Sequence, residues 1–153
     1  MLQLGLVIAG LVILLDQLSK LAILALLDGA VVVTPFLNLV VVWNRGVSFG
    51  MLDSAGAVMP WLLSGLALAV VAALGFWLRR VEHPLPGVAL GLIIGGALGN
   101  VIDRVRFGAV VDFLDVHALG YHWPAFNVAD SAICVGAALL LADGLLAPRR
   151  QST

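Results

Sequence analysis

The sequence predicts an all-α membrane protein with four transmembrane helices and a small extracytoplasmic β-strand element. Of the 153 residues, 62% are hydrophobic, against the roughly 45–50% apolar content of soluble domains. Only 11% are charged. Four apolar stretches are each long enough to cross a bilayer, which takes about 20 helical residues. We expect the whole chain, 1–153, to form a single integral membrane domain.

The four predicted spans are separated by polar or turn-forming residues. They cover approximately residues 5–27, 55–78, 84–102 and 128–147. The first span has the length of a secretory signal peptide, but it lacks a basic n-region and carries Asp16 and Lys20. We therefore expect it to be retained as a transmembrane helix.

Basic residues in short loops predict the orientation. The stretch "RRVEHP" (79–84) joins the second and third spans, and Arg149 and Arg150 follow the fourth. The positive-inside rule places this loop and both termini in the cytoplasm. Two longer segments, 28–54 and 104–127, are then extracytoplasmic. The net charge of −1 gives no indication of a nucleic-acid partner.

Both outer segments contain strand-like stretches. "VVVTPFLNLVVVWN" is rich in β-branched residues, is broken by Pro35 and runs into the turn-like "NRG". "AVVDFLDVH" also predicts a strand. Its period-two alternation places Asp112 on one face and Asp115 with His117 on the other.

Small and polar residues mark the third span and its neighbours. Gly87, Gly91, Gly95 and Gly99, with Gly96 beside them, form a row that lets another helix approach closely. We interpret this row as a helix-packing surface rather than a ligand site.

Polar residues then gather near the outer ends of the spans. Asn100, Asp103 and Arg104 share one face of the third span, and Asp16 and Lys20 form an i, i+4 pair in the first. Taken singly, Asp16 with Lys20 predicts an ion pair, and Asp103 with Arg104 a bridge at the interface.

The fourth span adds Asn127 and Asp130, three residues apart at its start. Several parts of the chain thus supply polar groups at one depth, and ionisable groups inside a membrane are functional-site candidates. The convergence predicts a site at the outer ends of the spans.

Other catalytic chemistries fit these residues less well. Cys134 lies in an apolar run, where a small buried side chain is the ordinary interpretation, and no histidine is near it in sequence. A metal site would draw on Asp112, Asp115, His117 and His122. Strand alternation separates Asp112 from that group, and the spacing matches no zinc signature, so we expect neither a metal nor another cofactor.

Two carboxylates give the most economical mechanism. If Asp112 and Asp130 face each other across a small wet cavity, like-charge repulsion keeps one protonated while the other is ionised. The ionised carboxylate takes a proton from water while the neutral one donates to a scissile carbonyl. This is aspartic-protease chemistry, and the sequence leaves open which carboxylate holds the proton.

Five motifs in order resemble those of bacterial lipoprotein signal peptidase, also called signal peptidase II. They are "DQLSK" (16–20), "NRGVSFG" (44–50), "GNVIDR" (99–104), "VVDF" (110–113) and "FNVAD" (126–130). The resemblance spans nearly the whole chain and includes the four-span plan.

The resemblance implies an aspartic endopeptidase of the bacterial inner membrane, with an extracytoplasmic cradle and loop, and we expect it to be a monomer. Its substrates would be prolipoproteins, cut before a diacylglyceryl-modified cysteine at the membrane's lipid surface. It implies that Asp112 and Asp130 are catalytic. The residues implied to support the site are Asp16, Lys20, Asn44, Gly46, Asn100, Asp103, Arg104 and Asn127.

Two other classes of function are alternatives. In a proton- or cation-coupled transporter, Asp16, Asp103 and Asp130 would form a relay along the spans, but transporter sites lie near the midplane. A purely structural membrane subunit leaves Asp112 and Asp130 without a role.

Overall fold

The computed structural model describes residues 1–46 and 58–146. Within these residues the helices are α1 (Leu2–Leu26), α2 (Met59–Leu78), α3 (Pro84–Phe107) and α4 (Val128–Leu146). All four are long and apolar enough to cross a membrane, which confirms the predicted number of spans. Parts of the predicted second and fourth spans (55–57 and 147) and of the predicted outer segment 28–54 (47–54) lie outside the described residues.

α3 continues past the predicted end of the third span at residue 102 and reaches Phe107, so the first residues of the predicted outer segment, 104–107, are helical. The helix ends where Gly108 adopts a left-handed conformation, with φ of 71°. The Gly108 N–H donates to the Arg104 carbonyl at 3.0 Å, a helix ending that glycine favours because it has no Cβ.

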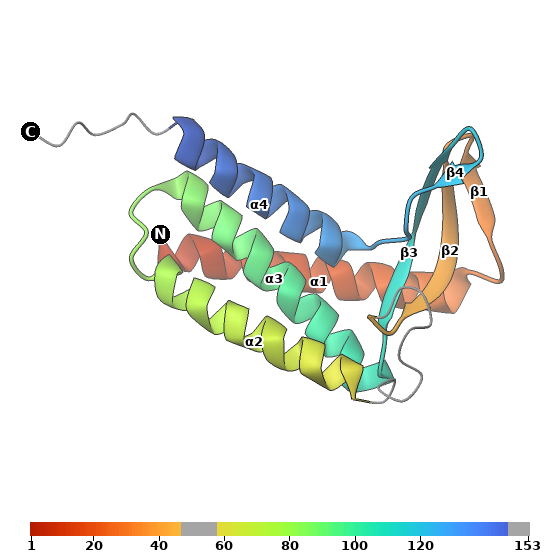
Figure 1. The fold of residues 1–153 in the computed structure, drawn as a ribbon, viewed down its shortest axis with the longest axis horizontal. Coiled ribbons are helices and arrows are strands. Elements are labelled where there is room, and N and C mark those ends of the chain that lie inside the picture. Colours follow the sequence, from red (N-terminus) through yellow and green to blue (C-terminus); the bar gives the residue numbers. More distant parts are fainter. Residues whose placement is uncertain (47–57, 147–153) are drawn as a thin grey trace, which may run out of the picture.

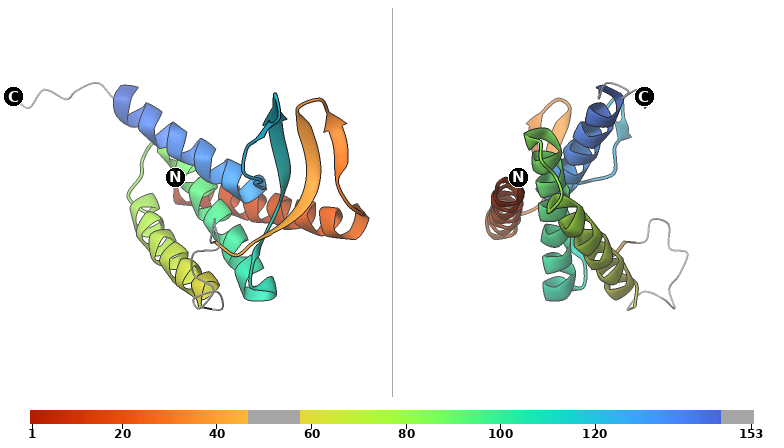
Figure 2. Two further views of the ribbon diagram at one scale, coloured as in Figure 1. Left: turned by 45° about the vertical axis from the view of Figure 1, so that its right-hand side comes forward. Right: turned by 90° about the vertical axis from the view of Figure 1, so that its left-hand side faces the viewer.

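α3 is the central helix of the bundle. It contacts α1, α2 and α4. Of the residues in its most apolar stretch, 67% are buried inside the protein, against 11% in the corresponding stretch of α2. The view along the bundle in Figure 2 shows the other three helices arranged around it. The apolar faces of α1, α2 and α4 that point away from α3 are left for lipid.

The glycine row of α3 forms the packing surface that the sequence predicts. A Cβ at Gly91 would lie 2.6 Å from the Gly5 carbonyl oxygen of α1, and one at Gly95 would lie 2.7 Å from the Ala9 carbonyl oxygen. Such distances leave no room for any side chain, so the two backbones touch. Gly96, on another face of α3, is similarly close to Ala129 of α4.

A four-stranded antiparallel sheet lies at one end of the bundle (Figure 1). Its strands, in spatial order, are β1 (Val31–Thr34), β2 (Leu37–Asn44), β3 (Val110–Ala118) and β4 (Tyr121–His122). β1 and β2 connect α1 to α2, while β3 and β4 connect α3 to α4. The two strand-like stretches of the sequence are thus confirmed. The amino terminus and the end of α4 lie at the opposite end of the bundle.

A β-bulge in β2 changes which face its side chains occupy. Leu39 pairs with Leu114, but the next aligned pair is Val42 with Asp112, so β2 has one extra residue at this point. Because side chains alternate along a strand, one extra residue moves every following side chain to the other face. Asn38 therefore shares a face with Asp115, whereas Asn44 shares a face with Asp112.

The close approach of α1 and α3 leads to a stability prediction. We expect Gly95→Ala to destabilise the protein by about 1–3 kcal/mol, because the new methyl group overlaps the Ala9 carbonyl. Gly10→Ala is the control, since a Cβ at Gly10 meets nothing within 4 Å. Equilibrium unfolding in detergent micelles measures both, and equal stability of the two variants would contradict the packing account.

Candidate active site

A buried lysine lies between two buried carboxylates. Lys20 Nζ is 2.8 Å from Asp16 Oδ2 and 2.7 Å from Asp103 Oδ2. All three side chains are nearly inaccessible to solvent. The predicted Asp16–Lys20 ion pair is confirmed, and it extends to α3.

The predicted Asp103–Arg104 bridge was wrong. Asp103 pairs with Lys20 of α1, and Arg104 Nε has no hydrogen-bond partner among residues 1–46 and 58–146. The reason is helical geometry, because successive residues of a helix point in directions about 100° apart and do not face each other. Arg104 is only half-buried, and it makes no ion pair with the carboxylate of its neighbour among the described residues.

The two carboxylates also hold the elements that carry the candidate catalytic residues. Asp16 Oδ1 accepts the backbone N–H of Ala129, at the start of α4, at 2.9 Å. Asp103 Oδ2 accepts the N–H of Val111, beside Asp112 on β3, at 3.1 Å. Gln17, which the sequence reasoning missed, donates to both carboxylates, at 3.1 Å to Asp16 and 2.9 Å to Asp103. Its place inside an apolar span was a signal that could have identified it.

α4 begins with a reciprocal cap that fixes Asp130. The Asn127 side-chain oxygen accepts the Asp130 N–H at 2.9 Å, and Asp130 Oδ2 accepts the Asn127 N–H at 3.2 Å. This pattern is a capping box, which satisfies backbone donors that a helix start otherwise leaves free. Asn100 Nδ2 adds a third contact, to Asp130 Oδ1, at 2.8 Å. Asn100 Oδ1 in turn accepts from Lys20 at 3.1 Å.

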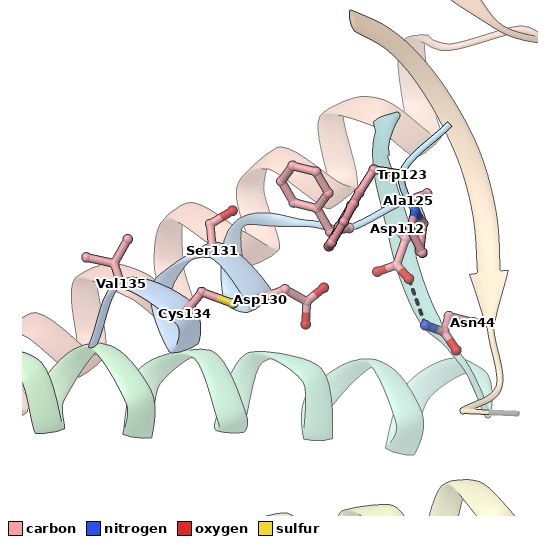
Figure 3. A pocket seen from close by; sticks show the side chains of 10 residues that line it. Asn44, Asp112, Trp123, Ala125, Asp130, Ser131, Cys134 and Val135 are labelled. Atoms are coloured by element: carbon pink, nitrogen blue, oxygen red, sulfur yellow. Dashed lines mark hydrogen bonds between the residues drawn. The ribbon is translucent and has the colours of Figure 1, made fainter. Parts of the chain in front are cut away.

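The same Asn127 also binds Asp112. Its Nδ2 donates to Asp112 Oδ1 at 2.7 Å, while Asn44 Nδ2 donates to Asp112 Oδ2 at 2.9 Å. In Figure 3 the carboxylates of Asp112 and Asp130 point toward the same space from β3 and from the start of α4. One asparagine thus contacts both carboxylates and sets their relative position.

The environment of Asp112 favours its neutral form. The side chain is 1% exposed. Burial is the main cause that raises the pKa of Asp112 to about 6, and the negative charge of Asp130 acts in the same direction. The hydrogen bonds from Asn44 and Asn127 oppose this rise. A carboxyl with a pKa of about 6 holds its proton below that pH and is then suited to acid catalysis.

A cavity of about 530 Å³ opens beside the two aspartates. Its walls come from β2, β3, the segment before α4 and the first turns of α4: Asn44, Asp112, Trp123, Pro124, Ala125, Phe126, Asp130, Ser131, Cys134 and Val135. The expectation that Cys134 is buried was wrong, since it is exposed and lines this cavity. Cys134 follows Asp130 by four residues, which puts both on one face of α4.

Asp115 lies on the opposite face of β3, as the strand alternation predicts. It accepts from Asn38 Nδ2 at 2.9 Å and contacts His122 Nδ1 at 2.8 Å. These two bonds, that of Asn38 first, hold the pKa of Asp115 below its usual range. Among the described residues, no group of three or more His, Cys, Asp or Glu side chains is arranged to hold a metal ion.

Most of the predicted site residues lie together. Hydrogen bonds or ion pairs join Asp16, Lys20, Asn44, Asn100, Asp103, Asp112, Asn127 and Asp130 in one network. Gly46, with φ of 85°, lies two residues after Asn44 in the chain, and its N–H donates to Asn44 Oδ1 at 2.8 Å. Residues 47–50 of the "NRGVSFG" motif lie outside the described residues.

Comparison with known proteins identifies the family. A model described as "Signal peptidase (SPase) II" matches residues 8–146. The chain belongs to the signal peptidase II family. It is therefore a multi-pass membrane protein and an aspartic peptidase, in agreement with the resemblance in its motifs.

Individual relatives are similar in sequence to this chain over most of its length. Lipoprotein signal peptidase of Methylobacterium sp. (strain 4-46) is 49% identical over 92% of this chain and 87% of its own length. That of Ralstonia nicotianae is 51% identical over 90% of this chain and 82% of its own length. A solved bacterial membrane enzyme structure, obtained by the in meso method at 1.9 Å resolution, superposes with a TM-score of 0.82 at 32% identity. It covers 94% of this chain and 93% of its own.

The buried ion pairs lead to a second stability prediction. We expect Lys20→Met to cost about 3–5 kcal/mol, because it leaves two carboxylates buried without a counter-charge. Arg106→Met is the control: Arg106 makes an exposed contact with Gln17, so its loss should cost less than about 1 kcal/mol. Unfolding in micelles measures both free energies. A cost for Lys20→Met no larger than that of the control would show that the ion pairs of Lys20 with Asp16 and Asp103 do not stabilise the fold.

Proposed function

We propose that Asp112 and Asp130 form the catalytic dyad with which this signal peptidase II cleaves lipoprotein precursors. The observation that carries the proposal is the shared contact with Asn127, which holds both carboxylates beside one cavity. Two carboxylates with different surroundings are what general acid–base hydrolysis requires. The names of the relatives, lipoprotein signal peptidases, support the substrate class.

The two carboxylates have distinct roles in this proposal. Asp130 is the ionised base, because it accepts two N–H donors at a helix N-terminus, where negative charge is favoured. Asp112 is the neutral acid, because burial raises its pKa to about 6. The different surroundings of the two carboxyls thus assign the base to Asp130 and the acid to Asp112.

The reaction follows from these roles. Asp130 removes a proton from a water molecule, whose oxygen attacks the scissile carbonyl carbon, while Asp112 gives its proton to the carbonyl oxygen. The resulting gem-diol collapses: one hydroxyl returns its proton to Asp112, and Asp130 gives its acquired proton to the leaving nitrogen. The C–N bond breaks, and both carboxyls return to their starting state.

The other predicted residues act on the dyad through position and charge. Asn44, Asn100 and Asn127 orient the two carboxylates. Asp16, Lys20 and Asp103 anchor α4 and β3 in this proposal, while Gly46 supplies the turn after Asn44 and Arg104 adds a positive charge at the same end of α3.

The topology and substrate details belong to the same proposal. Arg79 and Arg80 directly follow α2, which ends at the end of the bundle away from the sheet, and this supports cytoplasmic termini and an extracytoplasmic active site. A dyad at that depth suits a bond held at the membrane surface, as before a diacylglyceryl-modified cysteine, whose acyl chains anchor it in the lipid. The chain acts as a monomer, and the single-domain organisation stays a prediction.

Removing either carboxyl tests the dyad. We expect Asp112→Asn and Asp130→Asn each to lower kcat by at least about 100-fold, since each removes one titrating group. Asp115→Asn is the matched control on the same strand and should retain turnover. Cleavage of a purified diacylglyceryl-modified prolipoprotein measures all three in micelles, with unfolding curves to verify folding. Substantial activity of either dyad variant would remove that residue from the mechanism.

The pH dependence tests the roles. Because the pKa of Asp112 is raised to about 6, its proton is present below that pH and is lost as the pH rises through it, so kcat/KM should fall above about pH 6. Asn44 stabilises the charged form, so Asn44→Ala should move this limb to higher pH. Asn38→Ala, which removes a donor to Asp115 instead, should leave the limb in place. A limb that moves equally in both variants, or in neither, contradicts the assignment of the acid to Asp112.

A further inference from the structure

A second group of polar side chains occupies the face of β3 opposite the dyad. Asp115 is buried, and both of its oxygens lie near His122 Nδ1, at 2.8 and 2.9 Å. Asn38 donates to the same carboxylate, and the ring of His117 stacks on that of His122 with centroids 4.8 Å apart. The proposed hydrolysis uses none of these four residues.

His122 directly precedes a wall of the active-site cavity. β4, which contains it, has only two residues and pairs with β3 through His117 and Ala118. A strand of two residues contributes little stability by itself. The contact of His122 with Asp115 and its stacking on His117 therefore restrain the point where the chain leaves β4.

The wall itself is tied to β3 on the other side of this point. The Trp123 N–H donates to the Val116 carbonyl at 2.8 Å, and Phe126 exchanges two backbone hydrogen bonds with Leu114, at 2.9 and 3.1 Å. Residues 123–126 between these bonds line the cavity. A shift of His122 would be transmitted to Trp123, its neighbour in the chain.

Trp123 offers apolar surface beside the dyad. Its side chain is 59% exposed, and Figure 3 shows it among the side chains that surround Asp112 and Asp130. Val135 and Cys134 of α4 also line the cavity. Covering an exposed indole with an apolar group is favourable, because it removes apolar surface from water.

We propose that Trp123 is a specificity-determining residue that packs against an apolar group of the precursor next to the scissile bond, and that Asp115 and His122 are positioning residues for it. The proposal rests on the dyad proposed above. The apolar group has two possible sources: an acyl chain of the modified cysteine, or an apolar side chain of the signal segment.

Steady-state kinetics separate this role from a structural one. Trp123→Ala, Asp115→Ala and His122→Ala should each raise KM about tenfold and leave kcat near the wild-type value, because the dyad is untouched. Asp115→Ala in the Trp123→Ala background should add little, since the carboxylate acts through the indole. His122→Asn, whose amide nitrogen can replace Nδ1, should restore KM. Tyr121→Ala, next to His122 on β4, is the matched control and should leave KM unchanged.

Two altered precursors identify the apolar group. One carries shortened acyl chains, and the other carries alanine in place of the apolar residues just before the cut. The KM penalty of Trp123→Ala should disappear with the precursor that lacks the group Trp123 contacts. A penalty that persists with both precursors, an effect on kcat instead of KM, or additive effects of Asp115→Ala and Trp123→Ala would overturn the inference. The proposed dyad would stand as long as Asp112→Asn is inactive.

Discussion

The burial of Lys20 between Asp16 and Asp103 is the interaction on which the rest of the site depends. A buried charge without a partner costs several kcal/mol, so these three side chains must meet, and α1 must lie against α3 at this level. Each carboxylate has further acceptor capacity, which it uses for a backbone N–H of another element. The start of α4 and the start of β3 are thereby tied to one buried ion cluster, and these are the elements that carry Asp130 and Asp112.

The ion cluster requires backbones that nearly touch. A Cβ at Gly99 would lie 2.7 Å from Asp16 Oδ2, so any larger residue would displace the carboxylate from its partners. Gly91 and Gly95 bring the two helices equally close further along. In a bilayer, where lipid tails are as apolar as the helices, such close packing is a principal source of helix association. The glycine row and the ion cluster therefore depend on each other, one supplying the approach and the other the directional contacts.

The two aspartates of β3 show how one strand maintains two different electrostatic environments. Burial and the charge of Asp130 raise the pKa of Asp112, while hydrogen bonds from Asn38 and His122 lower that of Asp115. The alternation of side chains along a strand separates the two groups although only two residues lie between them. This separation could be predicted from the sequence. So could the four spans, because each is an apolar stretch long enough to cross a bilayer, and the packing role of the glycines, because a row at steps of four lies on one face of a helix.

The sequence by itself determined which residues share a face within each regular stretch of helix or strand, since that depends only on local backbone geometry. Which faces meet was decided by the tertiary structure. By alternation, Asn38 and Asn44 of β2 should point the same way, yet the bulge between them directs Asn38 to Asp115 and Asn44 to Asp112. Likewise Asp103 pairs with Lys20, more than 80 positions away, and not with the adjacent Arg104. A single inserted residue in a strand, or the choice of partner for a buried charge, depends on contacts between distant segments, and no local period encodes those contacts.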